Sequence, residues 1–387
     1  MKNLFKTILK ALQLTKKGRP LSAALVLQDM VPAPTAKPKR KLVKTTVRRK
    51  KSVVRHPQKP LPGSFVSGTF KSPHGLLSYK LYTPTGSARR RMPLIVMLHG
   101  CTQSAADFAA GTGMNALADE IGFLVLYPEQ SQAANLARCW NWHRPENQVR
   151  GKGEPAAIAA LTRYAIALCR ANPARIYIAG ISAGGVAAAI IAAAYPDLYV
   201  AAGVHSGLAH GNVSTLGAAL SAMRGGNGHS ATGKTTRPPP TIVFHGDKDA
   251  VVHPSNASGF LNTLQRSRPG PLVCRSHRGQ SQGGRAFTRK LYSSGPGEVL
   301  LEDWTVHGSG HSWSGGTTAG SHTDPAGPDA SREMVRFFLA RKRAVKGQIT
   351  APRPSRAYAI RRSRCDWMRA SHVTVSDCAG PWLPKIW

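Results

Sequence analysis

Between residues 61 and 343, short apolar runs alternate with longer stretches of helical periodicity. The apolar runs are residues 76–83, 93–98, 123–127, 176–179, 200–204, 241–245 and 299–306. The helical patterns lie between or after them, at residues 107–121, 154–171, 183–195, 256–266 and 330–343. Strands that alternate with helices and read as buried on both faces predict a doubly wound, mostly parallel α/β sheet. Ligands of such sheets bind beyond the carboxyl ends of the strands, so residues that follow a strand are the candidates for function.

The chain changes character on both sides of this predicted domain. Residues 1–31 include a helical pattern with Phe5 and Ile8 on an apolar face and lysines opposite, which predicts a basic amphipathic segment. Residues 32–60 combine prolines with clusters of lysine and arginine, as linkers do. Residues 344–387 are basic with little periodicity. We therefore expect a poorly ordered tail there and place the domain at residues 61–343.

The formal net charge of +35 is concentrated in these flanking segments. The first 60 residues carry +16 and residues 341–387 carry +9, which leaves the domain mildly basic. Such segments either bind an anionic or apolar surface or act as solvated tethers, and nothing in them specifies a nucleic acid. No apolar run reaches the length of about 18 residues that a membrane-spanning helix needs. Lysines interrupt the apolar part of the N-terminal segment, which favours a cytoplasmic location over secretion.

The sequence Gly180-Ile181-Ser182-Ala183-Gly184 lies between a buried strand pattern and an Ala/Ile-rich helical pattern. A G-x-S-x-G motif in the order strand, turn, helix presents a serine hydroxyl at a sharp turn, where it acts as a nucleophile. Glycine on both sides of the serine permits a strained backbone and close packing of helix on strand. The alternative is a glycine-rich turn without chemistry, and the residues that follow along the chain favour the nucleophile.

A serine nucleophile needs a histidine base and a carboxylate that orients the base, and in this architecture both follow the serine along the chain. Asp247 and Asp249, after one later strand, are the candidate carboxylates. His307 and His311, after the last central strand, are the candidate bases. We favour Asp249, since Asp247 lies beside a lysine at the strand end. We favour His311, because its glycine-rich loop can extend over the serine.

The negative charge that develops on a substrate oxygen needs two backbone N–H donors. One is expected from Ala183, directly after the serine. The second is expected from the loop His99-Gly100-Cys101-Thr102, either from the amide of Cys101 or, as the alternative, from that of Thr102. Three tryptophans near these segments either line an apolar substrate cleft or belong to the core: Trp140, Trp142 and Trp313.

Two further patterns do not fit the function they suggest. Residues 228–235 match the phosphate-binding pattern G-x-x-x-x-G-K-T, but three prolines follow where its helix would begin, so nucleotide binding is not expected. His307 and His311 lie in glycine-rich sequence with no carboxylate beside them, so neither a metal nor another cofactor is expected.

Six cysteines are too few for a disulfide scaffold, and a bridge between Cys101 and Cys139 is left open.

Several motifs in order carry a resemblance to a known family: LIVMLHGCTQ, CWNW, GISAGG, VHSGL, FHGDKDAVVHPSN and GSGHSWSGG. Over roughly residues 64–340 the chain resembles the poly(3-hydroxybutyrate) depolymerase family of α/β-hydrolase esterases. The resemblance implies an α/β-hydrolase fold, a catalytic triad of Ser182, Asp249 and His311, and a contribution of the Cys101 loop to the oxyanion hole. It also implies a polyester or short hydroxyacyl ester substrate. Related feruloyl and acetylxylan esterases make a carbohydrate ester the alternative. Secreted members of the family make an extracellular location the alternative, whereas the basic N-terminal segment suits the surface of an intracellular polymer granule.

The sequence as a whole predicts a serine esterase that works through an acyl-enzyme and without a cofactor. The alternative of another class is a non-catalytic protein of the same fold that coats a granule or binds a polyanion, which the basic flanking segments suggest. The acyl chain length and the preference for polymer or oligomer do not follow from the motifs.

Overall fold

The computed structural model describes residues 63–85, 91–209, 215–225, 237–268, 270–295 and 297–343. The chain divides into two units, Met1–Lys59 and Pro60–Trp387, and every described residue belongs to the second. The predicted amphipathic segment, the linker, the C-terminal tail and the glycine-lysine pattern at 228–235 therefore lie outside the described residues.

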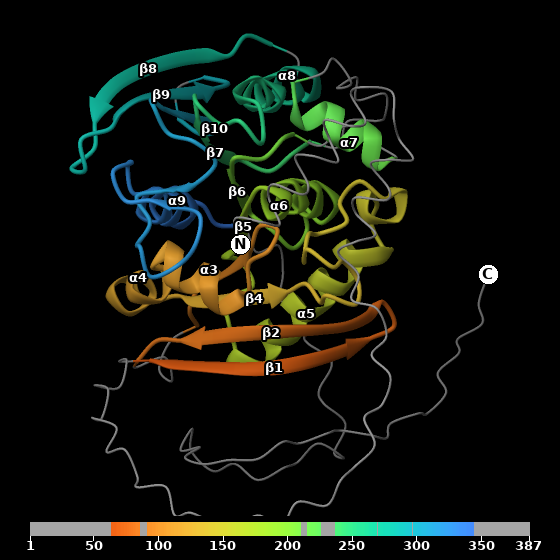
Figure 1. The fold of residues 1–387 in the computed structure, drawn as a ribbon. Coiled ribbons are helices and arrows are strands. Elements are labelled where there is room, and N and C mark those ends of the chain that lie inside the picture. Colours follow the sequence, from red (N-terminus) through yellow and green to blue (C-terminus); the bar gives the residue numbers. More distant parts are fainter. Residues whose placement is uncertain are drawn as a thin grey trace, which may run out of the picture. The chain divides into compact units, whose positions relative to one another are not determined.

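The described residues form a ten-stranded sheet in the order β1-β2-β4-β3-β5-β6-β7-β10-β9-β8 (Figure 1). The strands at its centre are parallel: β4 (Leu124–Glu129), β3 (Leu94–Leu98), β5 (Ile176–Ile181), β6 (Ala201–His205), β7 (Thr241–Gly246) and β10 (Val299–Val306). Antiparallel strands extend both edges: β2 (Gly75–Thr83) and β1 (Ser64–Ser72), and β9 (Ala286–Ser293) and β8 (Val273–Gln280). The predicted doubly wound, mostly parallel sheet is confirmed.

Helices cover both faces of this sheet. One face is covered by α5 (Gly153–Cys169), α6 (Ala183–Ala194) and α8 (Ser258–Ser267). The other face is covered by α3 (Ala105–Thr112), α4 (Met114–Ile121) and α9 (Ala330–Leu339). Shorter elements complete the connections: η2 (Pro145–Gln148), α7 (Leu216–Met223), η3 (Pro254–Ala257), and a two-stranded sheet of β11 (Trp313–Ser314) and β12 (Thr323–Asp324). None of the described helices has the length and apolar composition needed to cross a bilayer.

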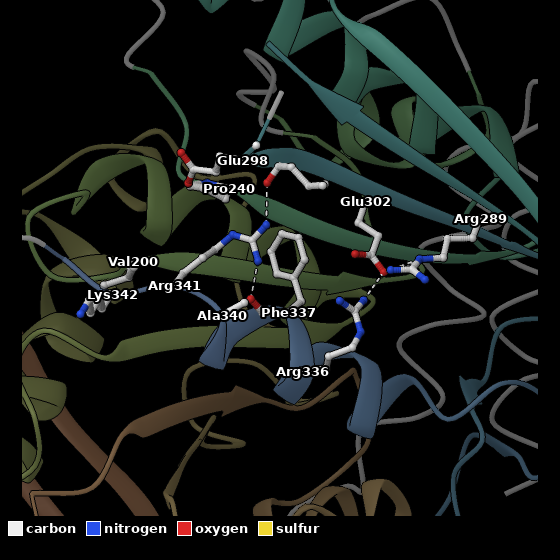
Figure 2. Close-up of a pocket in the computed structure, with 12 residues that line it drawn as sticks. Val200, Pro240, Arg289, Glu298, Glu302, Arg336, Phe337, Ala340, Arg341 and Lys342 are labelled. Atoms are coloured by element: carbon white, nitrogen blue, oxygen red, sulfur yellow. Dashed lines mark hydrogen bonds and ion pairs between the residues drawn. The ribbon is translucent and has the colours of Figure 1, made fainter. Parts of the chain in front are cut away.

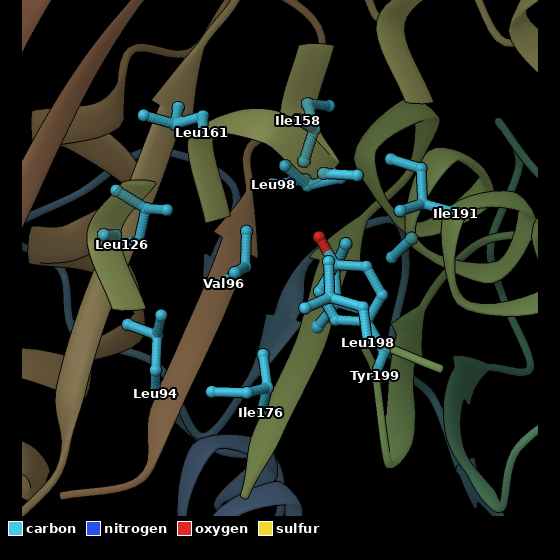
Figure 3. Packing of buried hydrophobic residues seen from close by; sticks show 14 of the residues in the cluster. Leu94, Val96, Leu98, Leu126, Ile158, Leu161, Ile176, Ile191, Leu198 and Tyr199 are labelled. Carbon is cyan, nitrogen blue, oxygen red and sulfur yellow. The ribbon is translucent and has the colours of Figure 1, made fainter. Parts of the chain in front are cut away.

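Strand β3 shows why the central strands read as continuous apolar runs. All of its residues are 0% exposed, because both faces of the strand are covered. Leu94, Val96 and Leu98 pack with residues of α5 and α6 (Figure 3), whereas Ile95 and Met97 pack on the opposite face. This burial on both sides fixes the positions of the strand ends, where the candidate functional residues begin.

The structure differs from the sequence-based expectations in one divided helix and in several elements that were not expected. The helix predicted at residues 107–121 is two helices, since Gly113 adopts φ 64° and ends α3 before α4 begins. Strands β1, β8, β9, β11 and β12 and helix α7 were not predicted. The residues of β8 are almost all exposed, so its sequence lacks the apolar run of a buried strand.

Candidate active site

The turn between β5 and α6 holds Ser182 in a strained backbone conformation. Its φ of 56° and ψ of −127° lie outside the regions that residues with a side chain normally adopt. Gly180 and Gly184 permit this turn, because a Cβ atom at either position would collide with the backbone carbonyl of Leu98. The serine therefore lies at the carboxyl end of β5, directly beside the end of β3, and is 8% exposed.

Asp249 and His311 form a buried carboxylate–imidazole pair. His311 Nδ1 lies 2.8 Å from Asp249 Oδ2, and the side chains are 16% and 0% exposed. The backbone N–H groups of Val251 and Val252 both donate to Asp249 Oδ1 at 2.9 Å. Burial alone would raise the pKa of Asp249, but the hydrogen bond from His311 and those from the two N–H groups lower it. The carboxylate is thus held ionised in one orientation toward the imidazole.

Asp247 and His307, the other two candidates, form a second and more exposed pair. Their Oδ2 and Nδ1 atoms are 3.0 Å apart, and the side chains are 32% and 41% exposed. His307 Nε2 also lies 2.9 Å from Thr288 Oγ1, so both ring nitrogens are engaged. By contrast, His311 Nε2 has no hydrogen-bond partner among the described residues and is available to accept a proton. The Asp249–His311 pair is therefore the one with the arrangement of an orienting carboxylate and a general base.

His205, at the end of β6, connects the serine to the loop that carries His311. Its carbonyl accepts the N–H of Ser182 at 2.9 Å, and its Nε2 accepts the N–H of Ser314 at 2.9 Å. The residue is 1% exposed and its ring stacks on Trp313, with centroids 5.1 Å apart. The sequence-based expectations gave His205 no role, although its position directly after a strand was a signal.

His205 also makes stability depend on pH. Burial, with the nearby His245 and His311, lowers its pKa from 6.5 to about 3. Between these values the unfolded chain binds a proton that the folded protein does not, so stability falls as the pH falls. We expect His205→Gln to reduce the slope of unfolding free energy against pH by about 1.4 kcal/mol per pH unit between pH 6 and 4. Urea unfolding at several pH values measures this slope. The exposed His74→Gln is the control, and identical slopes in wild type and His205→Gln would contradict the assignment.

The loop after β3 presents a backbone amide beside the serine. Cys101 and Ala183 pack in the same apolar cluster. The N–H of Thr102 donates to the carbonyl of Ala137 at 2.6 Å, whereas the N–H groups of Cys101 and Ala183 have no acceptor among the described residues. Of the two amides that the sequence left open, that of Cys101 is therefore the one without an acceptor among the described residues, as an oxyanion donor must be.

A disulfide joins Cys101 to Cys139, the pairing that the sequence left open. It closes a loop with a sequence separation of 38 residues. The loop after β3 is further held by Gln103, whose Oε1 accepts the N–H of Gly100 at 2.9 Å. Both restraints fix the backbone around the Cys101 amide.

Breaking this disulfide should reduce both stability and turnover. For Cys139→Ser, the chain-entropy relation gives a loss of roughly 3–4 kcal/mol in unfolding free energy. The Cys101 amide is still present in this variant but is held less rigidly. We therefore expect kcat to fall about tenfold, which is less than the loss when an oxyanion donor is removed. Urea unfolding and ester hydrolysis measure the two effects. Cys274→Ser, at an exposed free cysteine, is the matched control. Equal stability and turnover in the oxidised wild type and Cys139→Ser would contradict this role.

The three candidate tryptophans have different surroundings. Trp140 is 1% exposed and its indole N–H donates to the carbonyl of His99 at 3.2 Å. Trp313 is also 1% exposed and donates to Ser331 Oγ at 3.0 Å. Both rings therefore belong to the core, one of the two roles that the sequence allowed. Trp142 is 6% exposed and packs in the apolar cluster beside the serine turn, so it is the one we retain as a substrate contact.

A pocket of about 590 Å³ lies at the amino ends of the parallel strands β6, β7 and β10, whereas Ser182 lies at the carboxyl end of β5 (Figure 2). Most of its charges are partnered within the protein. Glu302, 1% exposed, pairs with Arg289 at 2.9 Å and with Arg336 at 2.5 Å, and Arg341 donates to two backbone carbonyls. Its lining contains no serine, cysteine or histidine, so the nucleophile and base are not found there. Among the described residues, no group of three or more His, Cys, Asp or Glu side chains is placed to hold a metal ion.

Comparison with known proteins relates this geometry to esterases. Residues 77–268 match the family described as Esterase PHB depolymerase. The chain is 32% identical over 260 residues to poly(3-hydroxyalkanoate) depolymerase C of Paucimonas lemoignei, covering 64% of this chain and 60% of that protein. It is 32% identical over 185 residues to feruloyl esterase B of Neurospora crassa, covering 43% of this chain and 62% of that protein. The chain thus spans about three fifths of each of these curated relatives.

A solved structure supports the fold. An acetyl xylan esterase from Aspergillus awamori superposes with a TM-score of 0.53 at 18% sequence identity, covering 72% of this chain and 99% of that one. At this identity the likeness concerns the arrangement of strands and helices alone. It agrees with the parallel sheet and the covering helices described above.

Proposed function

We propose that this chain, which belongs to the PHB depolymerase family of α/β-hydrolase-type esterases, is a serine esterase with Ser182 as its nucleophile. The observation that carries the proposal is the buried hydrogen bond of 2.8 Å between Asp249 and His311. The second ring nitrogen of His311, Nε2, has no hydrogen-bond partner among the described residues. His205 ties the backbone of the serine and the loop of His311 to the same strand end. A serine nucleophile, an oriented base and an ionised carboxylate are the three parts that hydroxyl activation needs.

In the first half of the proposed reaction, Ser182 Oγ attacks the ester carbonyl carbon and its proton passes to His311 Nε2. Asp249 accepts the Nδ1–H hydrogen bond and stabilises the imidazolium that forms. The amides of Ala183 and Cys101 donate to the oxyanion of the tetrahedral intermediate. The intermediate then collapses, the alcohol leaves with the proton from Nε2, and the acyl group remains on Ser182.

In the second half, His311 Nε2 removes a proton from a water molecule, which attacks the acyl-enzyme carbonyl. The same two amides hold the second oxyanion, and His311 returns the proton to Ser182 Oγ as the acid leaves. Each step uses groups of the chain itself, and none requires a cofactor.

For the substrate we propose a polyhydroxyalkanoate, such as poly(3-hydroxybutyrate), or a short hydroxyacyl ester. The similarity to a poly(3-hydroxyalkanoate) depolymerase, which spans more of this chain than the similarity to the feruloyl esterase, supports this choice. A feruloyl or acetylxylan ester is the second candidate, supported by the relatives named as such esterases. The proposed contact of Trp142 with an acyl chain suits either class.

A substrate panel tests the proposal. The full-length protein is assayed in parallel on amorphous poly(3-hydroxybutyrate), soluble hydroxybutyrate oligomers, a feruloylated sugar and acetylated xylan, with release of acid measured. We expect the hydroxybutyrate substrates to give the highest kcat/KM. Preference for feruloyl or acetyl groups would select the second candidate, and no hydrolysis of any ester together with tight granule binding would favour a non-catalytic coat protein.

We further propose that the basic flanking segments direct the protein to an anionic surface, such as a polymer granule in the cytoplasm, with an extracellular location as the alternative. The charges of +16 in the first 60 residues and +9 in residues 341–387 support this proposal. Electrostatic binding of this kind weakens as salt rises. Sedimentation of full-length protein with granules at low and high salt measures it, and binding that is independent of salt would contradict an electrostatic role.

A further inference from the structure

The loop that carries His311 is fastened on both sides by one residue, Asp324 of β12. Before the histidine, Ser309 Oγ donates to Asp324 Oδ2 at 2.7 Å. After it, the N–H of Gly315 donates to the backbone carbonyl of Asp324 at 2.9 Å. Ser309 is 1% exposed and Asp324 is 9% exposed, so these bonds are shielded from water. The position of the imidazole therefore depends on where Asp324 is held.

Asp324 is held in turn by Arg285, at the turn between β8 and β9. Arg285 Nε donates to Asp324 Oδ2 at 2.5 Å, and its Nη1 donates to the carbonyl of Gly308 at 3.0 Å. The side chains of Arg285 and Asp324 are 31% and 11% exposed, so the pair is stronger than one at the surface. A single guanidinium thus joins the start of the His311 loop to the carboxylate that fastens it. Its rigid fork suits two acceptors at once.

The same loop segment also contacts the turn that leads to Asp249, the carboxylate partner of His311. The carbonyl of Ser309 accepts the N–H of Lys248 at 3.0 Å, in the turn that leads to Asp249. Gly246, at the end of β7, lies so close to Ser309 and Gly310 that a Cβ atom would collide with their carbonyls. A shift of Ser309 would therefore disturb the Asp249–His311 hydrogen bond from both sides.

We propose that Arg285 is a positioning residue for catalysis, acting through Asp324 and Ser309 on the orientation of His311. This inference rests on the proposed serine esterase function. Arg285 contacts neither substrate nor reacting atoms in it. Loss of the guanidinium leaves Asp324 as a largely buried carboxylate without its cation, and such a group draws in water or moves. The imidazole then spends less time in the geometry that accepts the serine proton, so kcat falls while substrate binding is retained.

The experiment compares Arg285→Met, Arg285→Lys and wild type in the full-length protein, with p-nitrophenyl butyrate as substrate. Active sites are counted by the stoichiometric release of p-nitrophenol from diethyl p-nitrophenyl phosphate, and kcat is expressed per titrated site. For Arg285→Met we expect kcat per site to fall about tenfold with KM within about twofold. Arg285→Lys should recover part of the loss, since it restores the charge but not the fork.

Arg332→Met is the matched control, because Arg332 makes a bidentate pair with Glu120 at 2.8 and 2.7 Å and, among the described residues, no hydrogen bond or ion pair with Ser309, His311 or Asp324. It should leave kcat per site unchanged. If Arg285→Met folds poorly, Ser309→Ala removes one hydrogen bond of the same network and should lower kcat per site about threefold. A lower melting temperature with fewer titrated sites but unchanged kcat per site, in Arg285→Met or Ser309→Ala, would overturn the proposal. A wild type that neither titrates nor turns over would overturn it together with the esterase function.

Discussion

Replacement of Ser182 by alanine should reduce kcat for p-nitrophenyl butyrate by about 10⁴-fold or more. In the proposed reaction the hydroxyl oxygen of Ser182 forms the acyl-enzyme, and alanine offers no atom to replace it. The amides of Ala183 and Cys101 remain, so a small residual rate over the uncatalysed reaction is expected. The serine backbone is strained at φ 56°, and alanine adopts it with a similar penalty. The variant should therefore fold, and its activity alone should change.

Steady-state assays with the purified variant, together with its unfolding curve, measure this loss. Ser206→Ala is a suitable control, since Ser206 follows β6, has a positive φ of 47° and is 0% exposed, yet has no place in the proposed chemistry. Its Oγ contacts the ring of His205, so a small change in stability is expected there. Turnover by Ser182→Ala near that of the wild type would exclude Ser182 as the nucleophile.

Asp249→Asn should lower kcat by about 10⁴-fold, whereas Asp247→Asn should lower it by no more than about threefold. Asparagine at position 249 removes the negative charge that stabilises the His311 imidazolium and offers an N–H where an acceptor is needed. The two N–H groups that now donate to Asp249 Oδ1 also favour the charged form. Asp247 contacts His307, whose second nitrogen is bound to Thr288, and its Oδ1 accepts the N–H of Gly308 at 2.7 Å. Asparagine keeps one oxygen that can accept from Gly308, so the substitution affects mainly the partly exposed Asp247–His307 pair.

The two substitutions form a matched set, because each changes one carboxylate to an amide in the same turn after β7. Kinetic constants for both, over the pH range in which the wild type is active, measure the difference. A severe effect of Asp247→Asn with a mild effect of Asp249→Asn would transfer the proposed roles to Asp247 and His307.

The sequence predicted the central sheet because burial on both faces leaves a clear signal. In β3 all five residues are apolar and unexposed, and the strands on either side are buried along their length except for Glu129 at the end of β4. The edge strand β8 has polar and charged residues on both faces, since it is covered on neither, so its pattern does not differ from that of a loop. Gly113 could be read as a tolerated glycine in one helix, and only its left-handed conformation divides the two helices.

The site was predictable where a motif coincides with a strand end, and less so where the choice depends on contacts. The lysine beside Asp247 and the glycine-rich loop of His311 favoured Asp249 and His311, but each alternative also has a partner in the structure. What separates the pairs is burial and the second ring nitrogen, and neither is encoded in local spacing. Arg285 had no sequence signal, because its connection to the His311 loop crosses from one hairpin to a separate loop. The core role of Trp140 likewise follows from tertiary packing.

The most direct test of the account is to identify the residue that forms the covalent intermediate. The full-length protein is inactivated with diethyl p-nitrophenyl phosphate, which transfers its phosphoryl group to an activated serine and releases p-nitrophenol. The modified residue is then identified by peptide mass mapping. The account predicts one phosphoryl group per chain, located on Ser182, with loss of ester hydrolysis in proportion to modification. Complete modification of Ser182 with undiminished hydrolysis, or inactivation through another residue, would contradict it.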